Sequence, residues 1–180
     1  MVYRICVIAM VMALAGVVCL GQKASGSTTT ITPQNQQAIS MAQSLHDQMN
    51  QLELTGDLNG MLRYFTDNVV RMDNNRPMEV GRDAWLTSQT AMRTGATGFK
   101  TQSISTHVTN AWSDGSRLYE YGTTSMSVMI NGTIVDDPTK YFAVWVLNPT
   151  GAPQIELLIW NMTGTTSQGA QAAVAQAVKP

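Results

Sequence analysis

The stretch "FTDNVVRMDNNRPMEVGRDAW", Phe65 to Trp85, decides the fold of this chain. Within it, "NVVRM" predicts a β-strand, "DNNRP" predicts a turn, and "GRDAWLTSQTAMR" predicts a helix with Asp83 near its start and Gly95 beyond its end. The strand leads into Asp73. This residue could be a proton-transfer group at the rim of a pocket, or it could close the strand and hydrogen-bond the turn backbone.

Two further helices are predicted before this stretch. Thr32 followed by Pro33 is typical of a helix start, because threonine can cap free amides and proline fits the first turn. From there to Gly56, apolar side chains recur every three or four residues, which predicts one helix lying on a sheet. Asp57 can then cap a second, short helix. The apolar side chains are Ala38, Ala42, Leu45, Met49 and Leu52 in the first helix, and Leu58, Met61, Leu62 and Phe65 in the second.

Four long β-rich segments follow the stretch. They cover residues 99–113, 117–130, 133–147 and 153–162, and the turns between them are Asp114-Gly115, Asn131-Gly132 and "NPTG". Turn pairs of this kind predict hairpins, so the segments should form an antiparallel meander. In the third segment, "DDP" at 136–138 predicts a bulge or an edge irregularity, because proline cannot donate to a ladder. Such a bend would curve the sheet, and a curved sheet covered by helices can enclose a pocket.

The two ends of the chain differ in composition from its middle. Residues 1–21 carry one positive charge and then 16 residues without a polar side chain, which predicts a signal peptide and a secreted or periplasmic protein. Both cysteines, Cys6 and Cys19, lie in this segment, so no disulfide is expected after cleavage. Lipid attachment at Cys19 is disfavoured because Val18 stands where a small residue is required. The other predicted segments are a polar linker at 22–31, one domain at 32–164 and an Ala/Gln-rich tail at 165–180.

Composition also argues against several classes of partner. The formal net charge is −1 and basic residues form no cluster, which disfavours nucleic acid and anionic membrane surfaces. No membrane association is expected once the signal peptide is cleaved. The two histidines, His46 and His107, have no second histidine or carboxylate at a recognised metal-binding spacing. Neither a metal nor another cofactor is therefore expected.

Several short motifs resemble those of one superfamily in their order and spacing. They are Gly56-Asp57, "YFTDNVV" for an aromatic-x-Asp-Asp-Ala-Val run, "VGRDAW" for Gly-Arg-x-Ala, "KYFAVWV" for the penultimate strand, and "WN" at Trp160 and Asn161. Together they resemble the nuclear transport factor 2-like superfamily, in particular its SnoaL-like and ketosteroid isomerase-like small domains and the calmodulin-dependent kinase II association-domain group. The resemblance implies an α+β, cystatin-like fold, in which a cone-shaped curved antiparallel sheet wraps around three N-terminal helices. It also implies a small-molecule ligand in the cone and a homodimer packed through the sheet.

The same resemblance makes Asp73 a candidate catalytic residue. Asp73 falls where ketosteroid isomerases keep a general-base aspartate. The positions of their two oxyanion donors are close to Met49 and Lys140, which do not carry the same chemistry. Lys140 could stabilise an enolate by its charge, but it would make a nearby aspartate a poorer base. His107, alone in the middle of a strand, is a further candidate helper, although a hydrogen-bonded structural role is the alternative.

A second catalytic pattern of the superfamily is incomplete in this sequence. Epoxide hydrolysis there uses an Asp-Arg-Asp set. Arg71, Asp73 and Arg76 are close in sequence, but no third element at matching spacing identifies the set. An acid such as Glu120 could complete a site. On a strand, Glu120 points away from its neighbours Tyr119 and Tyr121, so a pocket on one face excludes one of the two sets.

Aromatic side chains are the main candidates for the walls of a ligand pocket, because they combine apolar surface with polar tips. Phe65 and Trp145 are expected in the core instead. The leading hypothesis is an exported domain that binds a small apolar or amphipathic molecule. The alternatives are a proton-transfer enzyme of isomerase, cyclase or dehydratase type with Asp73 as base, and a non-catalytic dimerisation or assembly module. The candidate ligand-binding residues are Tyr64, Trp85, Tyr119, Tyr121, Trp160 and Asn161.

Overall fold

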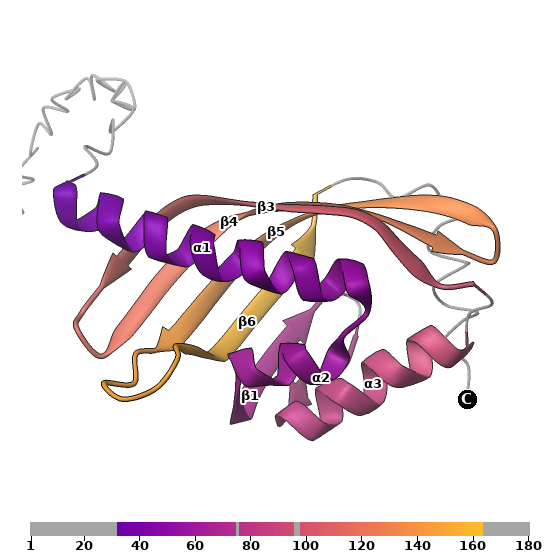
Figure 1. The fold of residues 1–180 in the computed structure, drawn as a ribbon, viewed down its shortest axis with the longest axis horizontal. Helices are drawn as coiled ribbons and strands as arrows, with labels where there is room; N and C mark the ends of the chain where they lie inside the picture. The colour runs from indigo at the N-terminus through magenta and orange to yellow at the C-terminus, as the bar shows by residue number, and fades with distance from the viewer. Residues whose placement is uncertain (1–31, 75, 96–97, 164–180) are drawn as a thin grey trace, which may run out of the picture. The chain divides into compact units, whose positions relative to one another are not determined.

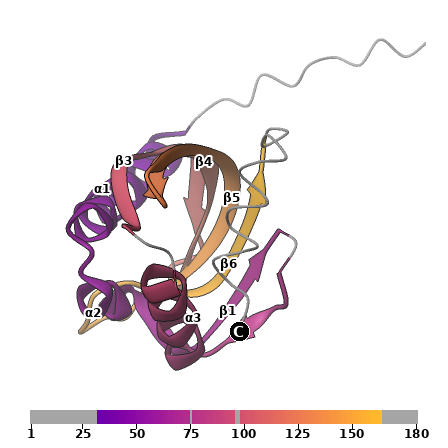
Figure 2. The same ribbon diagram turned by 90° about the vertical axis from the view of Figure 1, so that its right-hand side faces the viewer.

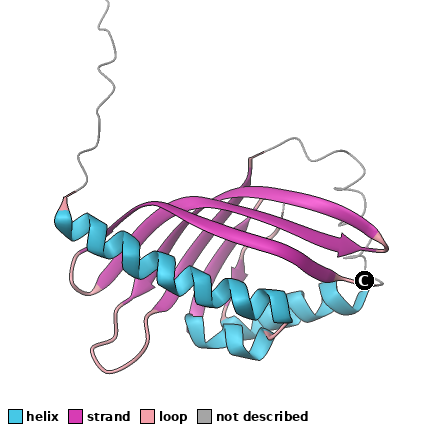
Figure 3. Ribbon diagram, turned by 45° about the horizontal axis from the view of Figure 1, so that its top comes forward, coloured by secondary structure: helices cyan, strands magenta, loops and turns pink. Residues whose placement is uncertain are grey.

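The computed structural model describes residues 32–74, 76–95 and 98–163, which form helices packed on one face of a curved sheet (Figures 1 and 3). The predicted signal peptide and linker, residues 1–31, and the predicted tail, residues 165–180, lie outside the described residues and stay predictions. Among the described helices, none has the length and apolar character that a membrane span requires.

The first two helices begin at their predicted caps, whereas the third helix includes Gly95, which was expected beyond its end, and Phe65, expected in the second helix, begins a strand. They are α1 (Pro33–Thr55), α2 (Leu58–Met61), the 3₁₀ turn η1 (Leu62–Tyr64) and α3 (Arg82–Gly95). The Thr32 hydroxyl accepts a hydrogen bond from the Asn35 amide at 3.3 Å and so caps α1. Gly56 ends α1 with φ of 72°, a left-handed conformation that glycine adopts without strain. Asp57 then accepts from the Gly60 amide at 2.8 Å, which confirms it as the cap of the second helix.

Six strands form one sheet that curves without closing into a barrel (Figure 2). They are β1 (Phe65–Asp73), β2 (Glu79–Val80), β3 (Lys100–Ser113), β4 (Arg117–Ile130), β5 (Thr133–Val146) and β6 (Gln154–Met162). Their spatial order is β2-β1-β6-β5-β4-β3, and the antiparallel pairing of β3 to β6 confirms the predicted meander. The β4–β5 turn has positive φ at Asn131 (52°) and Gly132 (77°), as a two-residue hairpin requires. The predicted α+β fold with a curved sheet around three N-terminal helices is confirmed.

Two details of the sheet differ from the prediction. β1 pairs with β6 in parallel, a long-range pairing that no local pattern reveals. The prediction of a bulge at 136–138 was wrong, because Asp136, Asp137 and Pro138 pair with β4 without a change of register. They nevertheless lie on an edge, since the pairing of β5 with β6 begins only at Thr139. Pro138 has no amide hydrogen to donate, but the pairing of β5 with β6 does not reach it, so it interrupts no ladder between these two strands.

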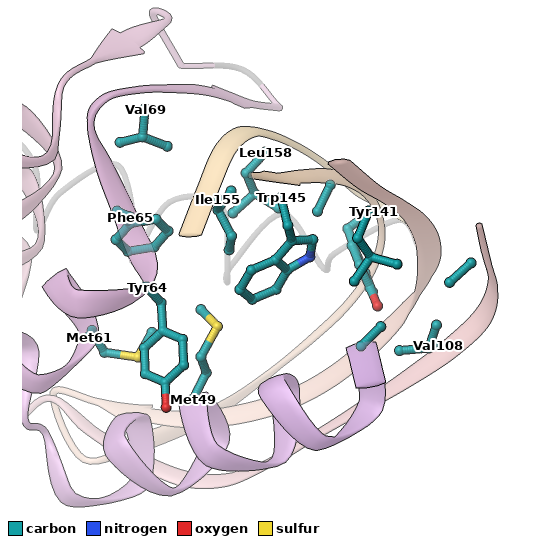
Figure 4. Packing of buried hydrophobic residues seen from close by; sticks show 14 of the residues in the cluster. Met49, Met61, Tyr64, Phe65, Val69, Val108, Tyr141, Trp145, Ile155 and Leu158 are labelled. Atoms are coloured by element: carbon teal, nitrogen blue, oxygen red, sulfur yellow. The ribbon is translucent and has the colours of Figure 1, made fainter. Parts of the chain in front are cut away.

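The core lies between α1 and the concave face of the sheet (Figure 4). Trp145 and Phe65 are 0% and 2% exposed, which confirms both as core residues. The buried positions of α1 are not all apolar, because His46 and Asn50 are as buried as Met49. Burial of polar groups costs free energy unless they are hydrogen-bonded, so these positions indicate a function other than packing.

Candidate ligand cavity

A cavity of about 650 Å³ lies between the concave face of the sheet and helices α1 and α3. Most of its wall is apolar and includes Met49, Phe65, Trp85, Met126, Ile155 and Trp160. This volume is within the range of small-molecule sites, which typically combine apolar walls with a few polar groups. Among the charged and polar side chains of the wall, two groups stand apart, one partly exposed to solvent and one buried.

The partly open place, named here the acidic end, is formed by Arg71, Asp73 and Asp137. Arg71 and Asp73 share the inner face of β1 because they are two residues apart on a strand. The Arg71 guanidinium donates to Asp73 Oδ2 at 2.7 Å and to Glu79 Oε2 at 3.4 Å. Arg71 is only 4% exposed, and burial lowers its pKa, although the two carboxylates oppose this effect. The ion pair holds Asp73 in place and occupies one of its oxygens.

Asp137 completes the acidic end from β5. It faces the cavity from the same side of the sheet as Thr139 and Tyr141, and its Oδ1 is buried without a hydrogen-bond partner among the described residues. Burial raises the pKa of Asp137, and the nearby charge of Asp73 raises it further. The raised pKa suits Asp137 to hold and release a proton. Arg71, Asp73 and Asp137 therefore line the same part of the cavity wall.

The raised pKa of Asp137 predicts how the stability of the protein depends on pH. Between pH 3.8, the ordinary pKa that applies in the unfolded state, and the raised pKa of the folded state, Asp137 is protonated in the folded protein and ionised in the unfolded chain. The unfolding free energy of the wild type therefore falls as pH rises through this range. The Asp137→Asn variant lacks this penalty. Its unfolding free energy minus that of the wild type should therefore increase between about pH 3 and pH 7. Urea denaturation at several pH values measures this difference, and a difference that stays constant would contradict the raised pKa.

The buried place, named here the histidine end, is formed by His46, Glu120 and Tyr141. His46 Nε2 lies 2.6 Å from Glu120 Oε1, and the same oxygen accepts the indole N–H of Trp145 at 2.8 Å. Glu120 is fully buried, and its Oε2 has no partner among the described residues. Burial raises the pKa of Tyr141, and the neighbouring Glu120 raises it further, so the phenol stays protonated.

Three of the predicted site residues lie in the cavity wall. They are Asp73, Trp85 and Trp160. Trp85 packs on Phe65 with ring centroids 4.9 Å apart, and the Trp160 indole donates to the Thr139 hydroxyl. Tyr64 was also expected there, but it packs in the core beside the cavity and donates its hydroxyl to Gln48 at 3.0 Å. Tyr64 is thus removed from the candidate site.

The other predicted site residues lie on the convex face of the sheet, away from the cavity. They are His107, Tyr119, Tyr121, Lys140 and Asn161. Their placement follows from strand alternation, because each neighbours an inward-facing residue such as Glu120, Thr139 or Trp160. The prediction that they line the cavity was therefore wrong. Tyr119 instead stacks on Trp112, with centroids 5.7 Å apart. The homodimer expected through this face stays a prediction, which sedimentation equilibrium would check.

Sequence reasoning missed three residues of the site, namely Asp137, His46 and Tyr141, and it considered Glu120 only as an acid that could complete a site. The signal for His46 was available, since it follows Ala42 by four residues and so falls on the buried side of α1. Asp137 was interpreted only as part of an edge irregularity. None of the described histidine and carboxylate side chains gather in a group of three or more that could hold a metal ion.

The fold can be compared with known proteins, although no protein-family model and no curated protein matches the sequence. A ketosteroid isomerase-like protein from Erwinia carotovora atroseptica superimposes with a TM-score of 0.58 at 12% identity, over 69% of this chain and 97% of that one. A putative dehydratase of the NTF2-like family from Streptomyces avermitilis gives 0.58 at 12% identity, over 72% and 99%. An NTF2-like protein with a cystatin-like fold from Novosphingobium aromaticivorans gives 0.54 at 12%, over 81% and 91%.

TM-scores of 0.54 to 0.58 establish a common fold, and identities of 12% leave the activity open, because one fold carries many functions. The chain therefore has the fold of the nuclear transport factor 2-like superfamily.

Proposed function

We propose that this protein binds a small, largely apolar organic molecule in the cavity, with a polar group of that molecule at the acidic end. The observation that carries the proposal is a 650 Å³ cavity whose apolar wall is interrupted by a fixed Arg71–Asp73 pair and by Asp137. The wall supplies affinity through burial of apolar surface, and the charged groups fix the orientation of the ligand. The proposal includes export, which rests only on the pattern of residues 1–21.

Binding of biphenyl and 4-hydroxybiphenyl tests this proposal. The wild type should bind each probe in a saturable one-to-one complex, measured by quenching of tryptophan fluorescence, because Trp85 and Trp160 line the cavity. Met126→Trp should abolish binding, since Met126 lies in the cavity wall and a larger side chain there fills the space. The matched control is Ile134→Trp, a change at a side chain that is 65% exposed. Binding that survives Met126→Trp, or no binding by the wild type, would overturn the proposal.

A second candidate function is proton transfer on a bound ketone, and the buried carboxyl of Asp137 favours it. A general base works best when its pKa lies near the working pH, and the pKa of Asp137 is raised in that direction. Asp73 is the weaker candidate because one of its oxygens already accepts from Arg71. Exchange of the α-protons of 2-tetralone in D₂O, followed by NMR, tests the reaction. Wild type should accelerate exchange and Asp137→Asn should not; equal rates would exclude Asp137 as the base.

The third alternative, a non-catalytic assembly module, receives less support. It would require a cone filled by side chains, whereas the cavity here is large enough for a ligand. The exposed Trp112 and Tyr121 are compatible with assembly, but assembly does not explain the polar groups buried inside the cone.

A further inference from the structure

The histidine end has no role in ligand binding as proposed above, yet it is built as a fixed polar site. His46 is 7% exposed, and its ring meets Tyr141 and Trp145 edge-on, with centroids 5.0 and 5.8 Å away. The Glu120 carboxylate makes a hydrogen bond with Nε2 of this ring. Three side chains from two strands therefore fix the position of one imidazole in the cavity wall.

The hydrogen bonds determine which ring nitrogen is left for a ligand. Trp145 Nε1 can only donate, so Glu120 Oε1 is an acceptor. Because Oε1 is already an acceptor, the hydrogen bond between Glu120 and His46 is assigned with Nε2 as its donor. The other nitrogen, Nδ1, has no hydrogen-bond partner within the described part of the chain, although the His46 side chain lines the cavity. A polar atom in this position is unsatisfied until a ligand or water meets it.

We infer that His46 Nδ1 binds a hydroxyl group at the inner end of the ligand, so that the ligand is an elongated apolar molecule with a polar group at each end. This inference rests on the proposed function and names the class of molecule that the same cavity takes. A hydroxyl fits because it can donate to Nδ1 of a neutral imidazole and accept from Nδ1–H of a protonated one. A carboxylate at this end is disfavoured by the charge of the buried Glu120.

The sheet also sets the length of the ligand. Asp73 and Tyr141 are both paired with Trp160, one on each side of β6. Their backbones are thus two strand spacings apart, about 10 Å. His46 contacts Tyr141 from α1, so the acidic and histidine ends are separated by roughly the length of two aromatic rings. A biphenyl with a hydroxyl at each end has these proportions.

Affinities for 4-hydroxybiphenyl and 4,4′-dihydroxybiphenyl test the inference. In the wild type, the second hydroxyl should increase affinity about fivefold to tenfold, the effect of one additional hydrogen bond. In His46→Gln, this gain should fall to the small statistical advantage of a ligand with two equivalent ends. Glutamine keeps an amide that can donate to Glu120, but it has no atom in place of Nδ1, so the fold should be retained. The matched control is His107→Gln on the convex face, which should keep the full gain.

A second measurement needs no variant at the site. The chain has two histidines, so ¹⁵N spectra of the imidazole nitrogens can be assigned with His107→Gln alone. Saturation with 4,4′-dihydroxybiphenyl should shift the Nδ1 resonance of His46, and biphenyl should shift it much less. If the probes bind and neither the affinity gain nor the Nδ1 shift is found, the inference is wrong while the proposed function stands. If no probe binds, both are overturned.

Discussion

Replacing Glu120 with alanine is expected to lower the unfolding free energy by about 3–5 kcal/mol, because two buried donors lose their acceptor and the side chain leaves a cavity. Glu120 is fully buried and accepts hydrogen bonds from His46 and from Trp145. Without it, two donors in the core lose their partner, and neither can reach water. Each unsatisfied buried group carries a desolvation penalty, and the truncated side chain leaves a cavity as well.

Chemical denaturation measures this effect, with Glu156→Ala as the matched control. Glu156 also pairs with an arginine, Arg117, but that pair lies at the surface, where salt and water screen it. The control should stay within experimental error of the wild type. The double variant His46→Leu and Glu120→Leu should cost less than the sum of the single changes, because it removes both members of the pair. A Glu120→Ala variant as stable as Glu156→Ala would show that the buried pair does not hold the fold.

Replacing Gly122 with alanine is expected to destabilise the fold by about 3 kcal/mol, although only one methyl group is added. Gly122 lies in β4 opposite Val108, beside the point where the β3–β4 register shifts between Val108 and Asn110. A Cβ atom there would overlap the carbonyl oxygen of His107 and would lie 3.0 Å from Cε1 of Tyr141. Backbone cannot move aside as a flexible side chain does, so β3 and β4 would have to separate.

The control for this change is Gly151→Ala, in the loop between β5 and β6. The nearest atom to a Cβ at Gly151 is Asn148 Cβ at 3.5 Å, an ordinary contact. Its stability should match or slightly exceed the wild type, because alanine reduces the entropy of the unfolded chain. Thermal melts monitored by circular dichroism compare the two. A Gly122→Ala variant that melts with the wild type would contradict the close approach of β3 and β4.

Most of the fold could be predicted because its signals are local. Thr32, Gly56 and Asp57 act through hydrogen bonds and backbone angles within a few residues of themselves, so sequence spacing reveals them. The Asn131-Gly132 turn fixes the β4–β5 register in the same way. The parallel pairing of β1 with β6 joins segments more than 80 residues apart, and no short-range pattern encodes it.

The candidate site was predicted less well, and strand alternation explains the errors. Strand alternation predicts that Glu120 faces one side of the sheet and its neighbours Tyr119 and Tyr121 face the other, but it does not predict which side is concave. The prediction assigned the two tyrosines to the cavity side of the sheet, whereas the structure places Glu120 on that side, where it is fully buried. His107 was misplaced for the same reason, whereas Lys140 was named from the family resemblance and lies between the inward-facing Thr139 and Tyr141. Asp73 and Trp160 were placed in the cavity because a family resemblance, and not alternation, pointed to their positions.

The sequence by itself determined the helices, the meander, the turn chemistry and the position of Asp73 at the end of a strand. These depend on periodicity and capping, which act over a few residues. Only the tertiary structure decided which chemistry surrounds Asp73. The curved sheet brings Asp137 to the Arg71–Asp73 pair, and α1 lays His46 on Glu120. Burial and charge proximity give these groups their properties, and both are produced by contacts between segments that the sequence keeps far apart.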